Sequence, residues 1–173
     1  MQNDEQVREA LERSARAVSI RRSVGRGVAA TKAVLRPSLE CTVTEGAHTL
    51  KVAMSGKYGG TDDGPNPGVL GRAALASCLA ITYGMWAARL GVPFDSLEVD
   101  LQADFDVRGE LGVDDAVRPG YAAMRYVVTV TSPSAEADVL RVLDTADRHS
   151  SYRDIFANGV PLAREVRVSA AAG

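Results

Sequence analysis

Cysteine and histidine are both scarce in this chain of 173 residues, which contains two of each. Cys41 and Cys78 are too few for a disulfide framework, and the N-terminus shows no signal-peptide pattern. We therefore expect a protein of the reducing cytoplasm. His48 and His149 lack the spacing to other ligands that a metal site requires, so we expect no bound metal.

Several function classes lack their usual sequence signals. The formal net charge of −2 provides no basic excess to neutralise phosphates, so we expect no nucleic-acid partner. The uncharged run 73–88 has 16 residues, fewer than the ~20 that span a bilayer, so we expect no membrane insertion. The GxSxG, GxxxxGK[ST] and GxGxxG patterns are absent, which removes the motifs of serine hydrolases and phosphate-binding loops.

One long helix is clearly signalled by the stretch PNPGVLGRAALASCLAITYGMWAARLG. Asn66 can cap its start and Pro67 suits the first turn, while Gly91 can end it and Pro93 blocks its continuation. The predicted helix, 67–90, is apolar on nearly all sides. Other elements must therefore cover it, and Cys78 lies in its middle.

Alternating polar and apolar residues predict strands on both sides of this helix. Three are expected within 31–55, and the later elements are strands at 97–107 and 121–131, a helix at 132–149 capped by Ser132, a short helix at 151–159 and a final strand at 161–169. This order predicts one α+β domain over 28–173, preceded by a helical arm over 1–27.

Two motifs and the order of elements resemble the OsmC/Ohr family of thiol-dependent hydroperoxide reductases. GPNPGVLGRAALASCLA is similar to the family's glycine-rich loop and Asn-Pro helix start, with a cysteine 12 residues after the asparagine. ADRHSSYRDIFANGV is similar to the segment that carries the family's second cysteine, and the element order matches over about 28–169. The resemblance implies antiparallel sheets wrapped around long central helices in an intertwined homodimer.

The resemblance also implies a reaction and a set of site residues. In the family a cysteine thiolate attacks the peroxide, a second cysteine closes a disulfide, and an external thiol reduces it without another cofactor. Cys78 matches the attacking cysteine, and Arg36 in VLRPSL matches the arginine that favours the thiolate. The second-cysteine position is Ser150, and the position of the glutamate that holds the arginine is Gly68.

The local sequence offers little to activate the thiol of Cys78. The residue lies about three turns from the helix start, beyond the reach of the helix dipole. Its neighbours one turn away carry no charge: Ala74, Leu75, Ile81 and Thr82. Activation must come from Arg36 or from arginines of the arm (Arg21, Arg22 or Arg26). Without such a partner Cys78 is an inert part of the core.

Three functions remain open at this stage. The first is a hydroperoxide reductase with a single peroxidatic cysteine, acting in oxidative stress defence with an external thiol as reductant. The second is a non-catalytic dimeric protein that holds an apolar or thiol-bearing ligand beside Cys78. The third is a hot-dog thioesterase, which needs a carboxylate near the central helix; residues 67–90 contain none.

Overall fold

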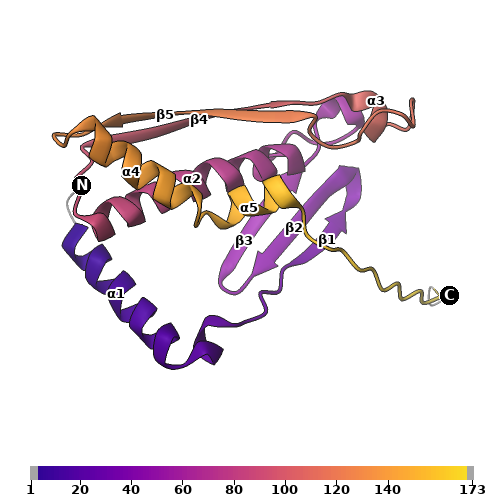
Figure 1. Cartoon of the computed structure of the whole chain (residues 1–173). Coiled ribbons are helices and arrows are strands. Elements are labelled where there is room, and N and C mark those ends of the chain that lie inside the picture. The colour runs from indigo at the N-terminus through magenta and orange to yellow at the C-terminus, as the bar shows by residue number, and fades with distance from the viewer. Residues whose placement is uncertain (1–3, 171–173) are drawn as a thin grey trace.

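The computed structural model describes residues 4–170 and combines helices with two antiparallel sheets (Figure 1). The helices are α1 (Asp4–Ile20), α2 (Pro67–Leu90), α3 (Val107–Glu110), α4 (Glu136–Asp147) and α5 (Ser151–Asn158), with 3-10 turns η1 (Arg22–Gly25), η2 (Pro37–Leu39) and η3 (Gly56–Tyr58). The strands are β1 (Lys32–Arg36), β2 (Glu40–Glu45), β3 (His48–Ala53), β4 (Ser96–Asp104) and β5 (Ala123–Thr131). The predicted α+β class is confirmed.

The core lies between α2, α4 and the ribbon formed by β4 and β5 (Figure 1). The two strands pair antiparallel from Ser96 opposite Thr131 to Asp104 opposite Ala123. Along β4, half-buried apolar residues alternate with exposed polar ones, as the sequence predicts. The buried cluster consists of Leu75, Leu79, Tyr83, Ala87, Val92, Phe94, Val142 and Ala146. Burying large side chains such as Tyr83 and Phe94 stabilises the fold by about 1.5–3 kcal/mol each.

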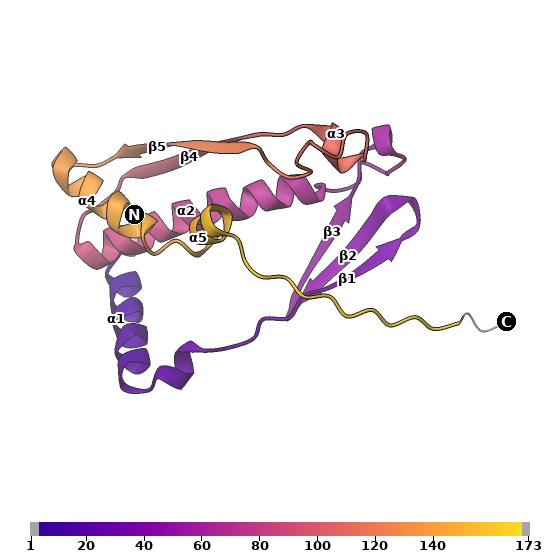
Figure 2. The same cartoon turned by 45° about the vertical axis from the view of Figure 1, so that its right-hand side comes forward.

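The second sheet has the order β1-β2-β3 and extends away from α2 in both views (Figures 1 and 2). Its strands form a meander in which Arg36 lies opposite Glu40 and Glu45 lies opposite His48. Only Val52 and Ala53, at the end of β3, are buried. Within a single chain, the three-stranded sheet is therefore covered only at the end of β3, where the chain leads towards α2.

The glycine-rich loop between β3 and α2 folds back closely on the end of β3. The backbone N–H of Asp62 donates to the carbonyl of Met54, and that of Gly60 donates to Ser55. A Cβ atom on Gly60 would lie 1.9 Å from the Met54 carbonyl oxygen, so only glycine fits there. Close backbone packing accounts for this glycine.

Helix α2 begins and ends where the sequence predicts. The Asn66 side chain accepts a hydrogen bond from the Val69 N–H at 3.0 Å, and Gly91 ends the helix with φ of 68°. By length and composition, α2 is the single described helix apolar enough to cross a membrane, a property that core helices of soluble proteins share. One of its faces packs on the core, while Ile81 on another face remains 63% exposed.

The predicted start of α4, the predicted end of β4 and the predicted final strand were wrong. Ser132 does not cap α4, which begins at Glu136: its hydroxyl accepts from the Ser134 N–H at 3.1 Å in the loop before the helix and donates to the Pro93 carbonyl at 2.7 Å. β4 ends at Asp104, since Asp106 caps α3 by accepting from the Arg108 N–H at 3.0 Å. The final segment, 161–169, is not a strand: it runs away from the body without pairing to another strand of the chain (Figure 2).

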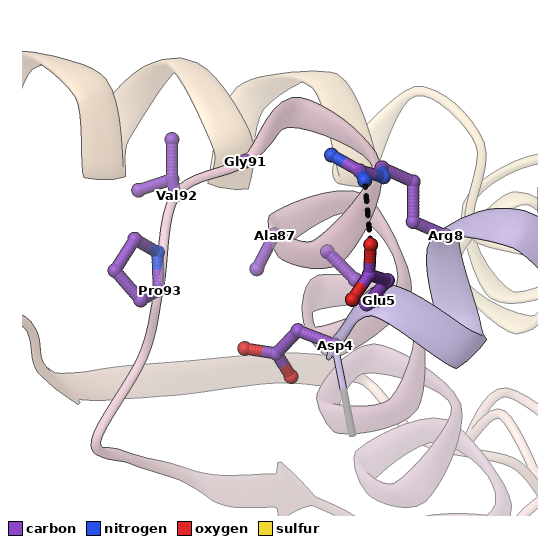
Figure 3. Close-up of a pocket in the computed structure, with 8 residues that line it drawn as sticks. Asp4, Glu5, Arg8, Ala87, Gly91, Val92 and Pro93 are labelled. Atoms are coloured by element: carbon purple, nitrogen blue, oxygen red, sulfur yellow. Dashed lines mark ion pairs between the residues drawn. The ribbon is translucent and has the colours of Figure 1, made fainter. Parts of the chain in front are cut away.

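Helix α1 lies near the N-terminus, and its first turns pack against the end of α2. It contacts α2 and projects from it in both views (Figures 1 and 2). At the junction, a hollow of about 180 Å³ lies between α1 and the chain that leaves α2 through Gly91 (Figure 3). The Glu5 carboxylate and the Arg8 guanidinium form an ion pair of 3.6 Å beside it. The hollow contains neither cysteine, so the thiol chemistry belongs elsewhere.

Candidate functional site

The sulfur of Cys78 lies where the middle of α2 meets the first turn of α5. Cys78 is half-buried, and Ser150, the residue that precedes α5, is only 3% exposed. Helix α4 ends at Asp147, so three residues return the chain to α2 before α5 begins. This short connection brings Ser150 and Ser151 against Cys78 from a distance of more than 70 positions in sequence.

Four uncharged donors surround the Cys78 sulfur. The hydroxyl oxygens of Ser150 and Ser151 each lie 3.6 Å from it, and that of Thr82 lies 3.9 Å away. The backbone N–H of Tyr152, in the first turn of α5, also donates to the sulfur. An N–H at a helix start has no partner within its helix and carries part of the positive end of the dipole. The arrangement suits a negatively charged sulfur.

The electrostatic balance at Cys78 favours the thiolate. Burial raises the pKa of the thiol, but the hydrogen bonds from Tyr152, Ser150, Ser151 and Thr82 together outweigh it and leave the pKa below its ordinary value. Charge is not the cause. The sequence predicted that a cation would activate Cys78. In the structure, hydroxyl groups and the N-terminus of α5 surround the sulfur instead.

Arg36 is not among the contacts of Cys78 within the described chain. It ends β1, on the three-stranded sheet, and lies opposite Glu40. The arm arginines Arg21, Arg22 and Arg26 are exposed, and the structure records no contact between them and the sulfur in residues 4–170. An activating role for an arginine therefore remains a prediction.

Gly68, at the position of the family's glutamate, lies in the first turn of α2. Its carbonyl accepts a hydrogen bond from the Tyr121 hydroxyl at 2.9 Å, and Arg72 donates to the same hydroxyl at 3.1 Å. A Cβ atom here would meet Asn66 Oδ1 at 3.2 Å and Arg72 Nη1 at 3.3 Å. The nearest cation to this position is thus Arg72 of the same helix.

A partly buried carboxylate network adjoins the serines and was not found from the sequence. Asp147 accepts from the Tyr83 hydroxyl at 2.7 Å and from the Tyr126 hydroxyl at 3.2 Å. The Arg153 Nε lies 3.6 Å from the Asp147 carboxylate and donates to Tyr126 at 3.3 Å. The network links α2, β5, α4 and α5, and so fixes the turn that presents Ser150. Only the apolar spacing of these helices, not their polar pairing, is visible in sequence.

Cys41 and the acidic and histidine side chains offer no second centre of this kind. Cys41 is a half-buried free thiol on β2. Within residues 4–170 no three His, Cys, Asp or Glu side chains come together closely enough to hold a metal ion. Of the two thiols, Cys78 is therefore the one surrounded by hydrogen-bonding groups from two helices.

Comparison with known families identifies the chain. The model of the OsmC-like protein family matches residues 60–165, which include α2, both strands of the ribbon, α4 and α5. The match covers more than half of the chain, so the chain belongs to the OsmC-like family. A comparison with curated protein sequences finds no match.

Solved structures show the same fold at low sequence identity. The OsmC-like protein of Mycoplasma pneumoniae is 15% identical, with a TM-score of 0.65 over 76% of this chain and 89% of that one. An organic hydroperoxide resistance protein OsmC from Legionella pneumophila is 16% identical, with a TM-score of 0.57 over 77% and 91%. A third, from Elizabethkingia anophelis and bearing a crystallant-derived thiocyanate, is 13% identical, with a TM-score of 0.54 over 77% and 90%. At these identities the solved structures establish the fold that the chain shares with them.

Proposed function

We propose that the protein is a thiol-dependent hydroperoxide reductase that uses Cys78 as its single peroxidatic cysteine. The observation that carries the proposal is the ring of donors around the sulfur, which lowers the pKa of the thiol without a nearby charge. A thiolate is the nucleophilic form of cysteine. The hydroxyl groups at 3.6 Å can rotate so that they donate hydrogen bonds to the sulfur when it is negatively charged. Membership of the OsmC-like family supports the choice of peroxide as substrate.

The proposed reaction has two stages. The Cys78 thiolate attacks one oxygen of the hydroperoxide, the O–O bond breaks, and the alkoxide takes a proton from solvent to leave as an alcohol. Cys78 is thereby oxidised to a sulfenic acid. Ser150 cannot condense with it, so an external thiol attacks the sulfur, water leaves, and a mixed disulfide forms. A second external thiol then restores Cys78 and leaves as the oxidised disulfide.

We further propose a homodimer in the cytoplasm as the active form. Large apolar side chains are exposed to solvent in several segments of a single chain; examples are Ile81 at 63%, Leu162 at 96% and Val168 at 91% exposure. Exposed apolar surface on this scale is typical of a surface that another copy covers. Because no contact joins Arg36 to Cys78 within the described chain, an activating role for Arg36 requires this assembly.

Peroxide consumption with dithiothreitol as reductant tests the proposal. The wild type and Cys41→Ser should consume an organic hydroperoxide, whereas Cys78→Ser should not. Arg36→Met should slow both peroxide consumption and alkylation of Cys78 at neutral pH. Activity that survives in Cys78→Ser would contradict the proposed role of this thiol, and equal alkylation rates would remove Arg36 from the mechanism.

A non-catalytic binding protein is the second candidate. The serine at position 150 and the glycine at position 68 favour it, because each replaces a residue of the family's redox cycle. A protein of this kind would leave the Cys78 thiol unoxidised when peroxide is added. A thioesterase is disfavoured, since α2 contains no carboxylate.

A further inference from the structure

A second cavity lies next to the candidate site, and none of the residues that contact the Cys78 sulfur line it. It has a volume of about 520 Å³, opens to solvent, and is bordered by α2, the start of β5, the loop that precedes β5, and α5. This volume falls in the range of about 300–1,000 Å³ that is usual for small-molecule sites. Leu75, Met124 and Phe156 provide apolar walls from three different elements. Cys78 is not among the lining residues, so the cavity is separate from the thiol.

Two guanidinium groups line the same cavity. Arg153 is held through its Nε by Tyr126 and Asp147, an arrangement that aims the group while leaving both terminal nitrogens available. Arg118, on the loop before β5, has no hydrogen bond or ion pair within the described residues. Two arginines against the single carboxylate of Asp147 leave the cavity with a net positive charge.

The other polar groups of the cavity are already engaged. The Tyr121 hydroxyl donates to the Gly68 carbonyl, and the Tyr126 hydroxyl donates to the Asp147 carboxylate. Neither phenol has a proton left to offer a ligand. The arginines are therefore the donors that remain, and a guanidinium prefers carboxylate or phosphate oxygens.

We infer that this cavity binds an amphipathic anion, with its carboxylate or phosphate head between Arg118 and Arg153 and its aliphatic body against Leu75, Met124 and Phe156. The inference does not depend on the proposed peroxidase activity, because no reaction at Cys78 is involved. A neutral molecule of equal length would gain the apolar contacts alone. A cation would be repelled by both guanidinium groups.

Binding of decyl compounds to the full chain tests the inference by isothermal titration calorimetry below their micelle concentrations. The four probes are decanoate, decyl phosphate, decanol and decyltrimethylammonium, which share a chain length and differ in the head. At least one anion should bind ten or more times tighter than decanol, and the ammonium compound should bind more weakly than decanol. The two anions distinguish a carboxylate site from a phosphate site. Anions that bind no tighter than decanol would overturn the inference.

Variants locate the binding. Arg118→Met should weaken anion binding at least tenfold, and this loop side chain has no partner whose loss would disturb the fold. Arg125→Met is the matched control: Arg125 lies nearby on β5 but is paired with Asp104 and Gln102 rather than facing the cavity. Ala157→Trp, on α5 one turn beyond Arg153, fills the cavity and should also abolish binding in a protein that keeps its circular dichroism spectrum. Equal weakening by the Arg118 and Arg125 variants would refute the assignment.

Discussion

The hydroxyl oxygen of Ser150 lies 3.6 Å from the sulfur of Cys78, in the position that the OsmC/Ohr resemblance assigns to a second cysteine. The serine is 3% exposed, so the pair is shielded from bulk water on one side. A hydroxyl can stabilise a thiolate or a sulfenic acid through a hydrogen bond. It cannot condense with the sulfenic acid to form the disulfide that a second cysteine would give. The pair thus places a hydroxyl, rather than a second sulfur, in contact with Cys78.

Ser150→Cys should restore the missing bond. Treatment of this variant with an organic hydroperoxide should give a disulfide between residues 78 and 150, because the side-chain atoms already lie within bridging reach. Peptide mass spectrometry would identify the bridge. Ser151→Cys should form one as well, since its hydroxyl is equally distant, but its exposed position should make the bond easier to reduce.

Ser132→Cys serves as the control for this prediction, because Ser132 bonds to Pro93 and does not contact Cys78. It should yield no bridge to Cys78. If Cys78 oxidises and neither the 150 nor the 151 variant forms a disulfide, the arrangement of α5 against α2 is not the one described. If Cys78 does not oxidise at all, the binding-protein alternative replaces the peroxidase.

The pH dependence of alkylation should report the donors around Cys78. In the wild type the midpoint should lie below that of a free cysteine, because the hydrogen bonds to the sulfur lower the pKa of the thiol. In the double variant Ser150→Ala, Ser151→Ala the midpoint should rise, because two hydrogen bonds to the thiolate are lost while burial remains. A lowered pKa in the folded state adds stability at pH above the unfolded value, which is lost as the pH falls through the folded value. Iodoacetamide kinetics from pH 6 to 10 would measure the midpoints; coincident curves would contradict the assigned role of the serines.

Local patterns predicted the parts of this fold that depend on local chemistry. Asn66 and Gly91 mark the ends of α2 because capping and the left-handed conformation involve residues within one turn. The alternation along β4 follows from one face packing on the core. Ser132 misled the prediction because its hydroxyl oxygen accepts from the Ser134 N–H as a capping residue would, but this turn lies in the loop and the helix begins only at Glu136.

The candidate site depends on contacts that sequence periodicity does not contain. Cys78, Ser150 and Arg36 came from the family resemblance, and the structure places only the first two in contact. Thr82 was visible as a neighbour one turn away, but the donors from α5 arise from tertiary packing. Likewise, the segment 161–169 alternates like a strand, yet within the described residues it pairs with no strand although both sheets have open edges, because alternation alone does not specify a pairing partner.

A charge at Ile81 should disrupt the proposed dimer. Its side chain is 63% exposed on the apolar helix α2, so Ile81→Asp costs a single chain little but places a carboxylate in a covered interface. The wild type should sediment as a dimer at micromolar concentration, and the variant should become monomeric or aggregate. Thr129→Asp, on the exposed face of β5, should remain dimeric. A compact wild-type monomer would contradict the assembly.

Gly68→Glu should stabilise the protein. Replacing glycine within a helix gains about 0.5–1 kcal/mol, and a carboxylate in the first turn adds about 0.3–1 kcal/mol through the dipole and Arg72, four residues on. The close atoms around the new Cβ are ends of the Asn66 and Arg72 side chains, which can adjust. Urea unfolding should therefore show a gain of about 1 kcal/mol. Gly68→Gln, which lacks the charge, should gain less; an equal gain would show that charge plays no part.

Tyr83 should remain protonated far into the alkaline range. Burial, reinforced by its hydrogen bond to the Asp147 carboxylate, strongly raises the pKa of its hydroxyl above the usual value of about 10. A raised pKa in the folded state contributes stability that is complete below the unfolded value and declines as the pH rises above it. The free energy of unfolding should therefore fall above pH 10 in the wild type, with a shallower fall in Tyr83→Phe.

The same substitution measures the strength of the carboxylate network. Tyr83→Phe removes the 2.7 Å hydrogen bond to Asp147 and should cost about 1.5–3 kcal/mol at neutral pH, the usual range for a bond to a charged group. Tyr58→Phe is the control, because Tyr58 lies in η3 and has no bond to a carboxylate within the described residues. Urea unfolding at pH 7 and pH 11 gives both the cost of the substitution at neutral pH and the loss of stability at alkaline pH.

Since the network fixes the turn that presents Ser150, Tyr83→Phe should also raise the alkylation midpoint of Cys78. A destabilised variant whose midpoint is unchanged would show that the serines hold their place without Asp147.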